Sequence, residues 1–218
     1  MKLIVITLSI LLLGCEHNNC HEEINSIPFY GYKKKCNEQI EADNKFLASM
    51  DKIHNNDRRK AAKDRIDSGW EYLYSNETKK AIMRFNQAYL LDSTYSDVYW
   101  AFGSIYFNQN NINLARKQYQ KGLEYDKNNS RILTDYGTTY MSEAMTKRDI
   151  RLIETAIKLM LQSFSLDSTN QNTSYKLASC YLLKSDCDNA IKFNDICISL
   201  GGDPITDKFS RELRKRCN

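Results

Sequence analysis

Proline and glycine are scarce in this chain, which has two prolines and eight glycines among 218 residues. Proline breaks helices and glycine weakens them, so their scarcity favours a mostly helical protein with few sharp turns. A strong charge of one sign is also missing, because 31 basic side chains are balanced by 27 acidic ones. The resulting net charge of +4 is too small to indicate a nucleic-acid partner, and we expect none.

The sequence also lacks the patterns that mark catalytic and metal sites. Its three histidines, His17, His21 and His54, do not have the spacing of metal ligands. His21 begins a stretch similar to a zinc-protease motif, but the second histidine of that motif is missing. Neither a glycine-rich phosphate loop nor a nucleophile elbow is present. We therefore expect a protein that is not an enzyme and that binds no cofactor and no metal.

A membrane-spanning run is missing too, because the leading apolar stretch Leu3 to Leu13 is about half of the roughly twenty residues that a membrane helix needs. Its length and its basic start are typical of a secretory signal peptide. The stretch ends in Leu12-Leu13-Gly14-Cys15, which resembles the lipobox of bacterial lipoproteins. That resemblance implies removal of residues 1–14, acylation of Cys15 and anchoring to a membrane face. The alternative is an ordinary signal peptide in which Cys15 is incidental.

Cysteine, by contrast, is abundant, with seven residues. If Cys15 carries lipid, an even number remains, and in an exported chain this favours disulfides over metal binding or catalysis. Cys20 and Cys36 precede the main body and are expected to pair by proximity. The other four lie in the last quarter of the chain, at Cys180, Cys187, Cys197 and Cys217.

Small and aromatic residues recur with a period of 34. Gly69, Tyr72, Ala81, Phe85 and Ala88 recur as Gly103, Tyr106, Ala115, Tyr119 and Gly122, then as Gly137, Tyr140, Ala156, Met160 and Ser163, and then as Ala178, Tyr181, Ala190, Asn194 and Cys197. This pattern resembles the tetratricopeptide repeat, a helix–turn–helix unit. The resemblance implies an all-α, right-handed α-solenoid of four units at 62–95, 96–129, 130–170 and 171–204. One hairpin cannot bury both of its faces, so the units must stack.

Two departures from the repeat carry predictions. The proline usual near the end of a unit is replaced by Ser93 and Ser168, which can cap the following helix. In the third unit, the step from Tyr140 to Ala156 is seven residues longer than in the others. Seven residues are close to two helical turns, so both helices should lengthen by about a turn, reverse near Lys147 to Asp149 and protrude as a finger. A disordered loop is the alternative.

Both ends of a solenoid need a cap. Residues 205–218 are expected to form a short amphipathic helix, with one apolar face, that serves as the C-terminal cap. Residues 37–61 carry a helical apolar stripe and should be an N-terminal capping helix, or half of a decayed fifth unit. Residues 15–36 should be an irregular, lipidated tether. Because the C-terminal helix should stack parallel to the first helix of the last unit, Cys217 is expected to bond to Cys187. Cys180 and Cys197 either bond or stay as buried thiols.

In tetratricopeptide arrays the first helix of each unit lines a concave groove. Carried over by position, the resemblance places Trp70 and Tyr74, Trp100, Phe107 and Asn108, and Tyr175 in one groove that binds a partner. The remaining positions are Lys63, Ile66, Leu73, Asp97, Ser104, Arg131, Thr134, Thr138, Met141, Ser142, Asn172, Ser179, Leu182 and Leu183. Exposed aromatic residues on a rigid wall are typical anchors of protein recognition. The alternative is that the N-terminal helix covers the tryptophans and makes them core.

These features predict a membrane-anchored scaffold or assembly factor of the bacterial envelope that binds another envelope protein. The architecture is similar to small tetratricopeptide lipoproteins that assist outer-membrane protein assembly, pilus secretin targeting or cell-wall hydrolase regulation. The anchor is expected at the outer membrane in preference to the inner one. The alternative is a lipoprotein module that binds a glycan or a peptide nutrient in the aromatic groove.

Overall fold

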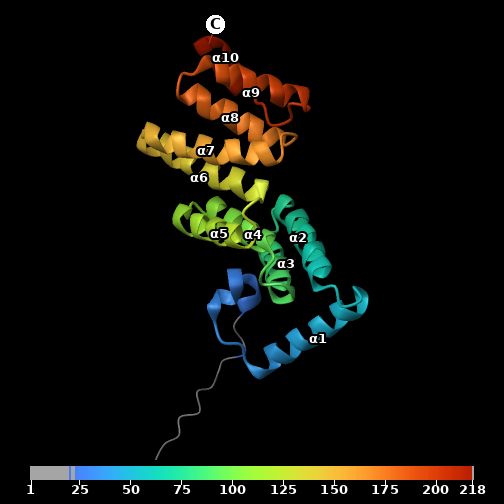
Figure 1. The fold of residues 1–218 in the computed structure, drawn as a ribbon. Helices are drawn as coiled ribbons and strands as arrows, with labels where there is room; N and C mark the ends of the chain where they lie inside the picture. The colour runs from blue at the N-terminus through green and yellow to red at the C-terminus, as the bar shows by residue number, and fades with distance from the viewer. Residues whose placement is uncertain (1–19, 21–22, 218) are drawn as a thin grey trace, which may run out of the picture.

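A computed structural model describes Cys20 and residues 23–217 of the chain. The expected signal peptide and Cys15 lie outside these residues. Every regular element in the described part is helical, which confirms the all-α class, and successive helices pack as antiparallel pairs in an elongated stack (Figure 1). Within the same ranges, no helix combines the length and the apolar character that crossing a bilayer requires.

Four helix pairs make up the stack. Each pair has a first and a second helix: α2 Arg58–Tyr74 with α3 Thr78–Leu91, α4 Ser96–Asn108 with α5 Ile112–Tyr125, α6 Ser130–Lys147 with α7 Ile150–Leu166, and α8 Gln171–Leu183 with α9 Cys187–Ser199. Helix α1, Asn37–Ile53, precedes them, and α10, Asp207–Cys217, follows them. Two short 3-10 turns, η1 Ile24–Ser26 and η2 Pro28–Tyr32, lie at the front. Helix α2 begins four residues before the expected start of the first unit.

Small residues allow the two helices of each pair to touch. A Cβ atom on Gly69 would lie 2.2 Å from Cε1 of Phe85, and one on Gly103 would lie 2.3 Å from Cε1 of Tyr119. The alanines at the other small position, Ala81, Ala115, Ala156 and Ala190, are fully buried. The recurring small and aromatic residues are therefore the contact between helices, and each pair is packed in the same way.

The turns inside the pairs also repeat. Asn76, Asn110 and Ser185 each adopt a left-handed backbone conformation, with φ near +60°, between the two helices of a pair. Asparagine tolerates this conformation better than most residues because its short side chain can hydrogen-bond locally. In the third pair Arg148 takes this place, with φ of 56°.

In the turns between successive pairs, an aspartate takes the place of the serine that was expected to act there. Asp92 Oδ1 accepts hydrogen bonds from the backbone N–H and the hydroxyl of Thr94, and Asp167 does the same for Thr169. The residue that caps α8 is Asn170, whereas Tyr95, at the N-cap position of α4, makes no side-chain capping bond. The prediction that Ser93 and Ser168 cap the next helix is wrong, because the aspartate before each serine already closes the turn.

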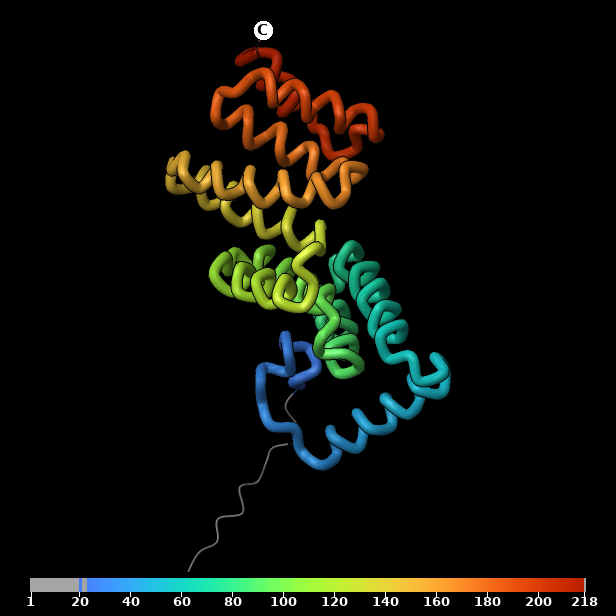
Figure 2. The backbone as a smooth tube through the Cα atoms, viewed as in Figure 1, coloured from blue at the N-terminus to red at the C-terminus, as the bar shows by residue number. Residues whose placement is uncertain are grey.

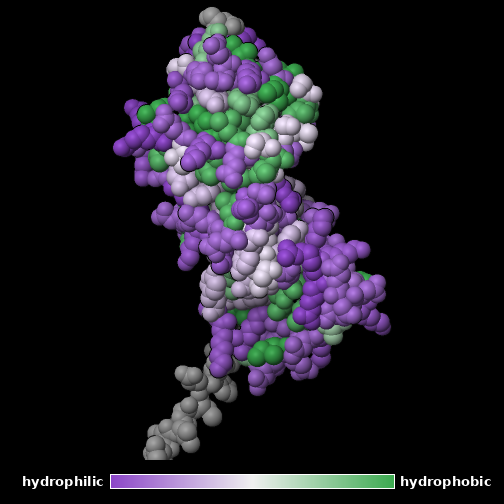
Figure 3. Space-filling model, in the orientation of Figure 1, coloured by the Kyte–Doolittle hydropathy of each residue, from purple (hydrophilic) through white to green (hydrophobic). Residues whose placement is uncertain are grey.

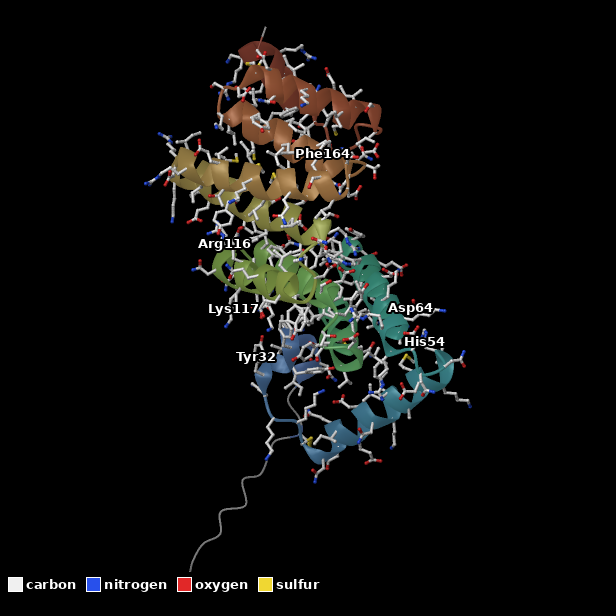
Figure 4. The ribbon with its side chains drawn as sticks, in the orientation of Figure 1. Tyr32, His54, Asp64, Arg116, Lys117 and Phe164 are labelled. Atoms are coloured by element: carbon white, nitrogen blue, oxygen red, sulfur yellow. A yellow bond between two sulfur atoms is a disulfide. The ribbon has the colours of Figure 1, made fainter. Side chains whose placement is uncertain are left out.

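The third pair forms the predicted finger. Its helices have 18 and 17 residues, whereas the second pair has 13 and 14, and they reverse at Arg148-Asp149. The tube in Figure 2 shows the turn between α6 and α7 protruding beyond the edge of the stack. The base of the finger is fastened to α5 by Arg116 (Figure 4), which lies over the ring of Tyr140 and pairs with Glu143 at 2.6 Å.

The N-terminal part of the described chain differs from both expectations, the tether at 15–36 and the capping helix at 37–61. Residues 24–32, expected as part of a tether, are docked on the stack; we call them the hook. Phe29 is 3% exposed, and its ring lies 4.1 Å from that of Phe102 and 5.1 Å from that of Tyr89. The buried amide of Asn86 donates to the backbone carbonyls of Asn25 and Ile27 at 2.9 and 2.8 Å.

Helix α1 is a strut rather than a stacked cap. It runs from the hook to α2 (Figure 1), and it has no buried residue. Of its expected apolar stripe, Leu47 and Met50 pack against the first core cluster, whereas Ile40 and Ile53 are exposed. At its end, His54 lies beside Asp64 of α2 (Figure 4), with 3.8 Å between Nε2 and Oδ2. The hook docks on α3 and against Phe102 of α4, at the junction of the first two pairs, while the helix expected as a cap contacts α2.

Replacing Asn86 with alanine is expected to loosen the hook. The backbone carbonyls of Asn25 and Ile27 lose the hydrogen bonds from the Asn86 amide, and each such bond typically contributes about 0.5–1.5 kcal/mol. Hydrogen exchange of the amides of Ile27, Tyr30 and Lys33, which bond within the hook, should become faster, while amides of α8 should not change. Lys79→Ala, on an exposed position of the same helix, is the matched control. Unchanged protection of the hook in Asn86→Ala would contradict this account.

Candidate functional site

An aromatic groove lies on the face formed by the first helices of the pairs; it is defined by Trp70, Tyr74, Trp100 and Phe107. The ring centroids of Trp70 and Trp100 are 4.3 Å apart, and Tyr74 stacks on Trp70 at 5.9 Å. Both tryptophans are half-buried, whereas Tyr74 is 77% exposed. Because α2 and α4 each belong to a packed helix pair, these rings are presented on a rigid wall. The groove has a volume of about 630 Å³.

Asp135 connects three helices across the floor of the groove. Its carboxylate accepts a hydrogen bond from Nε1 of Trp100 at 2.8 Å and one from Nζ of Lys176 at 3.1 Å. These contacts join α4, α6 and α8 at one side chain. The orientation of the Trp100 ring is thereby fixed before any partner arrives, which lowers the entropic cost of binding.

A second polar contact lies beside this floor. Arg131 pairs with Asp97 at 2.6 Å, and its guanidinium lies 4.7 Å from the ring of Trp100. Asp97 also accepts hydrogen bonds from the Asn129 amide at 2.7 Å and from the hydroxyl of Tyr95 at 2.9 Å. Burial, and then the nearby Asp97 carboxylate, raise the pKa of Tyr95. Tyr95 therefore stays a neutral donor, and the charge of Asp97 is matched by Arg131.

The groove thus combines flat aromatic faces with amides and paired charges. Asn76, Asn108, Asn170 and Asn172 line its rim. Such a surface can bury apolar or planar groups and satisfy the hydrogen bonds of a polar backbone at the same time.

The structure divides the residues that the sequence placed in one groove. Trp70, Tyr74, Trp100, Phe107 and Asn108 line the aromatic groove, together with Leu73, Ser104, Arg131, Thr134, Thr138 and Asn172. Tyr175 does not. It packs edge-on to Phe209 of α10, with ring centroids 5.1 Å apart, and lines a separate hollow. Ile66 and Asp97 are buried, and Lys63 pairs with Asp67 instead. The hollow that Tyr175 lines is also lined by Met141, Ser179, Leu182 and Leu183.

The reason for the division is the C-terminal helix. Helix α10 inserts Phe209 and Leu213 against the last pair, so the far part of the inner face has a third wall. We call the space between α6, α8 and α10 the finger hollow; it is defined by Met141, Met145, Tyr175, Leu182, Leu183 and Phe209.

The tryptophans also combine the two roles that the sequence set as alternatives. Trp70 belongs to the periphery of the first core cluster, 5.6 Å from the ring of Phe85, and it also lines the groove. The N-terminal segment does not cover them, because the hook docks on Phe102 and Tyr89.

Sequence reasoning missed Asp135 and Lys176. Asp135 is the sixth residue of the third unit, directly after Thr134, which was among the expected groove positions. The available signal was its place in the chain, because this acidic residue lies between the expected groove positions Thr134 and Thr138 of the same helix.

The two ends of the described chain are held by disulfides. Cys20 is bonded to Cys36 and Cys187 to Cys217, with Cα atoms 5.8 and 5.3 Å apart. Cys180 and Cys197 are thiols in the structure. Burial raises the pKa of the Cys180 thiol to about 12, which keeps it protonated and unreactive.

Non-reducing peptide mapping is expected to recover a peptide pair joined through Cys187 and Cys217. That bond closes a loop with a sequence separation of 30, and a loop of this size is worth about 3.6 kcal/mol in the chain-entropy model. Cys217→Ser should therefore speed hydrogen exchange in α10 while leaving α2–α5 unchanged, and Ser210→Ala is the control on the same helix. Recovery of Cys217 as a free thiol, or joined to Cys20, would show that this connectivity is wrong.

Comparison with known proteins agrees with this architecture. The family model of the tetratricopeptide repeat matches residues 96–129. Among solved structures, pilF of Pseudomonas aeruginosa superposes with a TM-score of 0.61 at 21% identity, over 73% of this chain and 68% of that one. The Cut9–Hcn1 hetero-tetramer of the APC/C gives 0.59 at 17% identity, over 72% of this chain but 30% of that one.

YrrB, a tetratricopeptide protein with an unusual peptide-binding site, gives a TM-score of 0.50 at 18% identity, over 82% of this chain and 86% of that one. A search of curated proteins finds no match in sequence. At these identities the solved structures establish similarity of fold alone.

Proposed function

This chain is a tetratricopeptide-repeat protein, and from that premise we propose that it is a membrane-anchored, non-catalytic scaffold or assembly factor of the bacterial envelope. Its proposed partner is another envelope protein, bound in the aromatic groove. The observation that carries the proposal is the stack of the exposed Tyr74 on the half-buried Trp70, whose ring in turn contacts that of Trp100. Aromatic residues of this kind dominate the energy of protein interfaces.

The proposed ligand in the groove is a peptide segment. The amides along the rim can pair with a peptide backbone, while the rings accept an apolar side chain. The peptide-binding site known for YrrB lies on the same kind of solenoid. Anchoring through a lipid on Cys15 is supported by the lipobox pattern, and we propose the outer membrane as its location.

The test compares two tyrosines that are almost equally exposed. Tyr74 lies on the groove and Tyr32 lies on the hook, at 77% and 73% exposed. Partners are captured by crosslinking in intact envelopes, identified and purified, and their affinity for each variant is measured. Trp100→Ala is expected to weaken binding by about 2 kcal/mol or more, as truncation of an aromatic anchor does. Tyr74→Ala should weaken it less, and Tyr32→Ala should not change it.

Circular dichroism separates binding from folding. Trp100→Ala should keep its helical spectrum, and a variant that melts instead would assign Trp100 to the core. A glycan array probed with the same proteins tests the alternative. Saturable binding of a glycan that Tyr74→Ala abolishes, with no envelope protein captured, would replace the scaffold by a nutrient-binding module.

A further inference from the structure

We propose that the finger hollow is a second docking site, and that it binds an amphipathic α-helix of a partner protein whose flanks are acidic. The hollow lies between α6, α8 and α10, has a volume of about 340 Å³ and is separate from the aromatic groove. It arises from two features that the regular repeat lacks. The extra turn of α6 carries Met145, and the C-terminal helix carries Phe209.

The apolar surface of the hollow is continuous with the side of the finger. Met145 and Leu183 line the finger hollow and also a neighbouring depression with Ile150 and Ile153. Met145 is 61% exposed and Ile150 is 51% exposed. Apolar side chains are thus left open to water around one hollow, whereas the visible surface over α1 and α2 is largely hydrophilic (Figure 3). Methionines at such a site can adapt to the shape of a ligand.

The chemistry of the lining favours a helical ligand over an extended one. Most of the uncharged lining is apolar, and its serine and threonine hydroxyls already have partners: Ser179 donates to the carbonyl of Tyr175 at 2.9 Å, and Thr206 accepts from the backbone N–H of Phe209 at 3.2 Å. An extended peptide would bury backbone N–H and C=O groups against this lining without partners, which is costly. A helix satisfies its own backbone and can place one apolar stripe between α6 and α10.

The charge around the hollow favours acidic flanks. Helix α10 carries five exposed basic side chains and two exposed acidic ones, and Lys208 and Arg216 reach the rim of the hollow, together with the acidic Glu212. Arg148 lines the neighbouring depression that shares Met145 and Leu183 with the hollow, while Asp149 beside it is paired with Arg151 at 2.8 Å. A helix with glutamates beside its apolar stripe would meet a predominantly positive rim, which steers association and selects the partner.

The experiment uses the mature chain in detergent and three fluorescein-labelled peptides of about five helical turns. The first is an amphipathic helix with a leucine stripe and glutamate flanks, the second has lysine flanks, and the third scrambles the acidic sequence. Fluorescence anisotropy should show saturable binding of the first peptide, about tenfold tighter than of the other two, or about 1.4 kcal/mol. The mixture should also gain helical circular dichroism over the sum of its components.

One variant inside the hollow and one outside it test the site. Leu183→Glu should weaken the acidic helix about tenfold or more, because it places a like charge in the apolar floor. Ile198→Glu changes a residue of α9 that is 57% exposed and lies outside the hollow, so it should leave the affinity unchanged. Reversing the rim with Lys208→Glu and Arg148→Glu should shift preference toward the lysine-flanked peptide.

Several outcomes would overturn the proposal. Equal binding of the scrambled peptide, absence of saturable binding by the acidic helix, or no effect of Leu183→Glu would each remove the site. Concentration-dependent dimerisation that Leu183→Glu abolishes would assign the hollow to a second copy of this chain. Binding to anionic vesicles that Leu183→Glu abolishes would assign it to a lipid surface. The readout is independent of the aromatic groove, so it can fail while the proposed function stands.

Discussion

Replacing Gly103 with valine is expected to lower the free energy of unfolding of the second repeat by about 3 kcal/mol, at the upper end of the usual cost of overpacking a core. The added Cβ would lie 2.3 Å from Cε1 and 2.6 Å from Cδ1 of Tyr119. Tyr119 cannot move aside, because it is 1% exposed and its hydroxyl lies 3.3 Å from that of Ser104. In a solenoid each unit contacts only its neighbours, so weakening an inner unit divides the stack.

Thermal and urea unfolding followed by circular dichroism would measure the loss. A double-mutant cycle gives the control. In the Tyr119→Leu background the ring is gone, so the added cost of Gly103→Val should shrink by more than the error of additive behaviour, about 0.5 kcal/mol. Equal costs in both backgrounds would mean that the close approach of α4 and α5 at this position does not limit stability.

Cys15→Ser is expected to reduce the incorporation of labelled fatty acid to background and to release the protein from the membrane fraction. Two or more acyl chains are needed for stable anchoring, and each buried methylene contributes about 0.8 kcal/mol. The basis is the Leu12-Leu13-Gly14-Cys15 sequence. Labelling of growing cells with an alkyne fatty acid, followed by fractionation, measures both effects.

Cys20→Ser is the matched control for Cys15→Ser, since Cys20 is disulfide-bonded to Cys36 and should carry no lipid. That variant should keep its label and its place in the membrane fraction. If Cys15→Ser stays labelled and sediments with membranes, the lipobox interpretation is wrong, while the groove and the finger hollow are unaffected.

Patterns of short range made much of this architecture predictable. The spacing of Gly103 and Tyr119 recurs every 34 residues, and such a spacing specifies two helices that touch. The length of the finger followed from seven extra residues, because two helical turns preserve the phase of the apolar face. Eleven of the groove positions implied by the resemblance to the repeat also line the aromatic groove. The spacing and the finger need only the geometry of one helical hairpin, whereas the groove positions were carried over from the repeat family.

The hook could not be predicted in this way. Asn86 lies 61 residues from Asn25, to whose carbonyl it donates. Neither residue belongs to the repeating pattern, and the stretch around Phe29 has no helical or strand period. Its docking depends on a site that Phe102 and Tyr89 form only when two successive pairs are stacked.

By itself, the sequence determined the fold class, the positions of the helix pairs and the finger, because local spacing sets which helices form and which faces they bury. Tertiary structure alone decided that Tyr175 leaves the aromatic groove and that Asp135 joins three helices at its floor. It also decided that the hook docks at the junction of the first two pairs while α1 stays exposed. The physical reason is the same in each case. These contacts depend on how far successive pairs rotate and on where the end segments dock, and no periodic pattern in the chain encodes those distances.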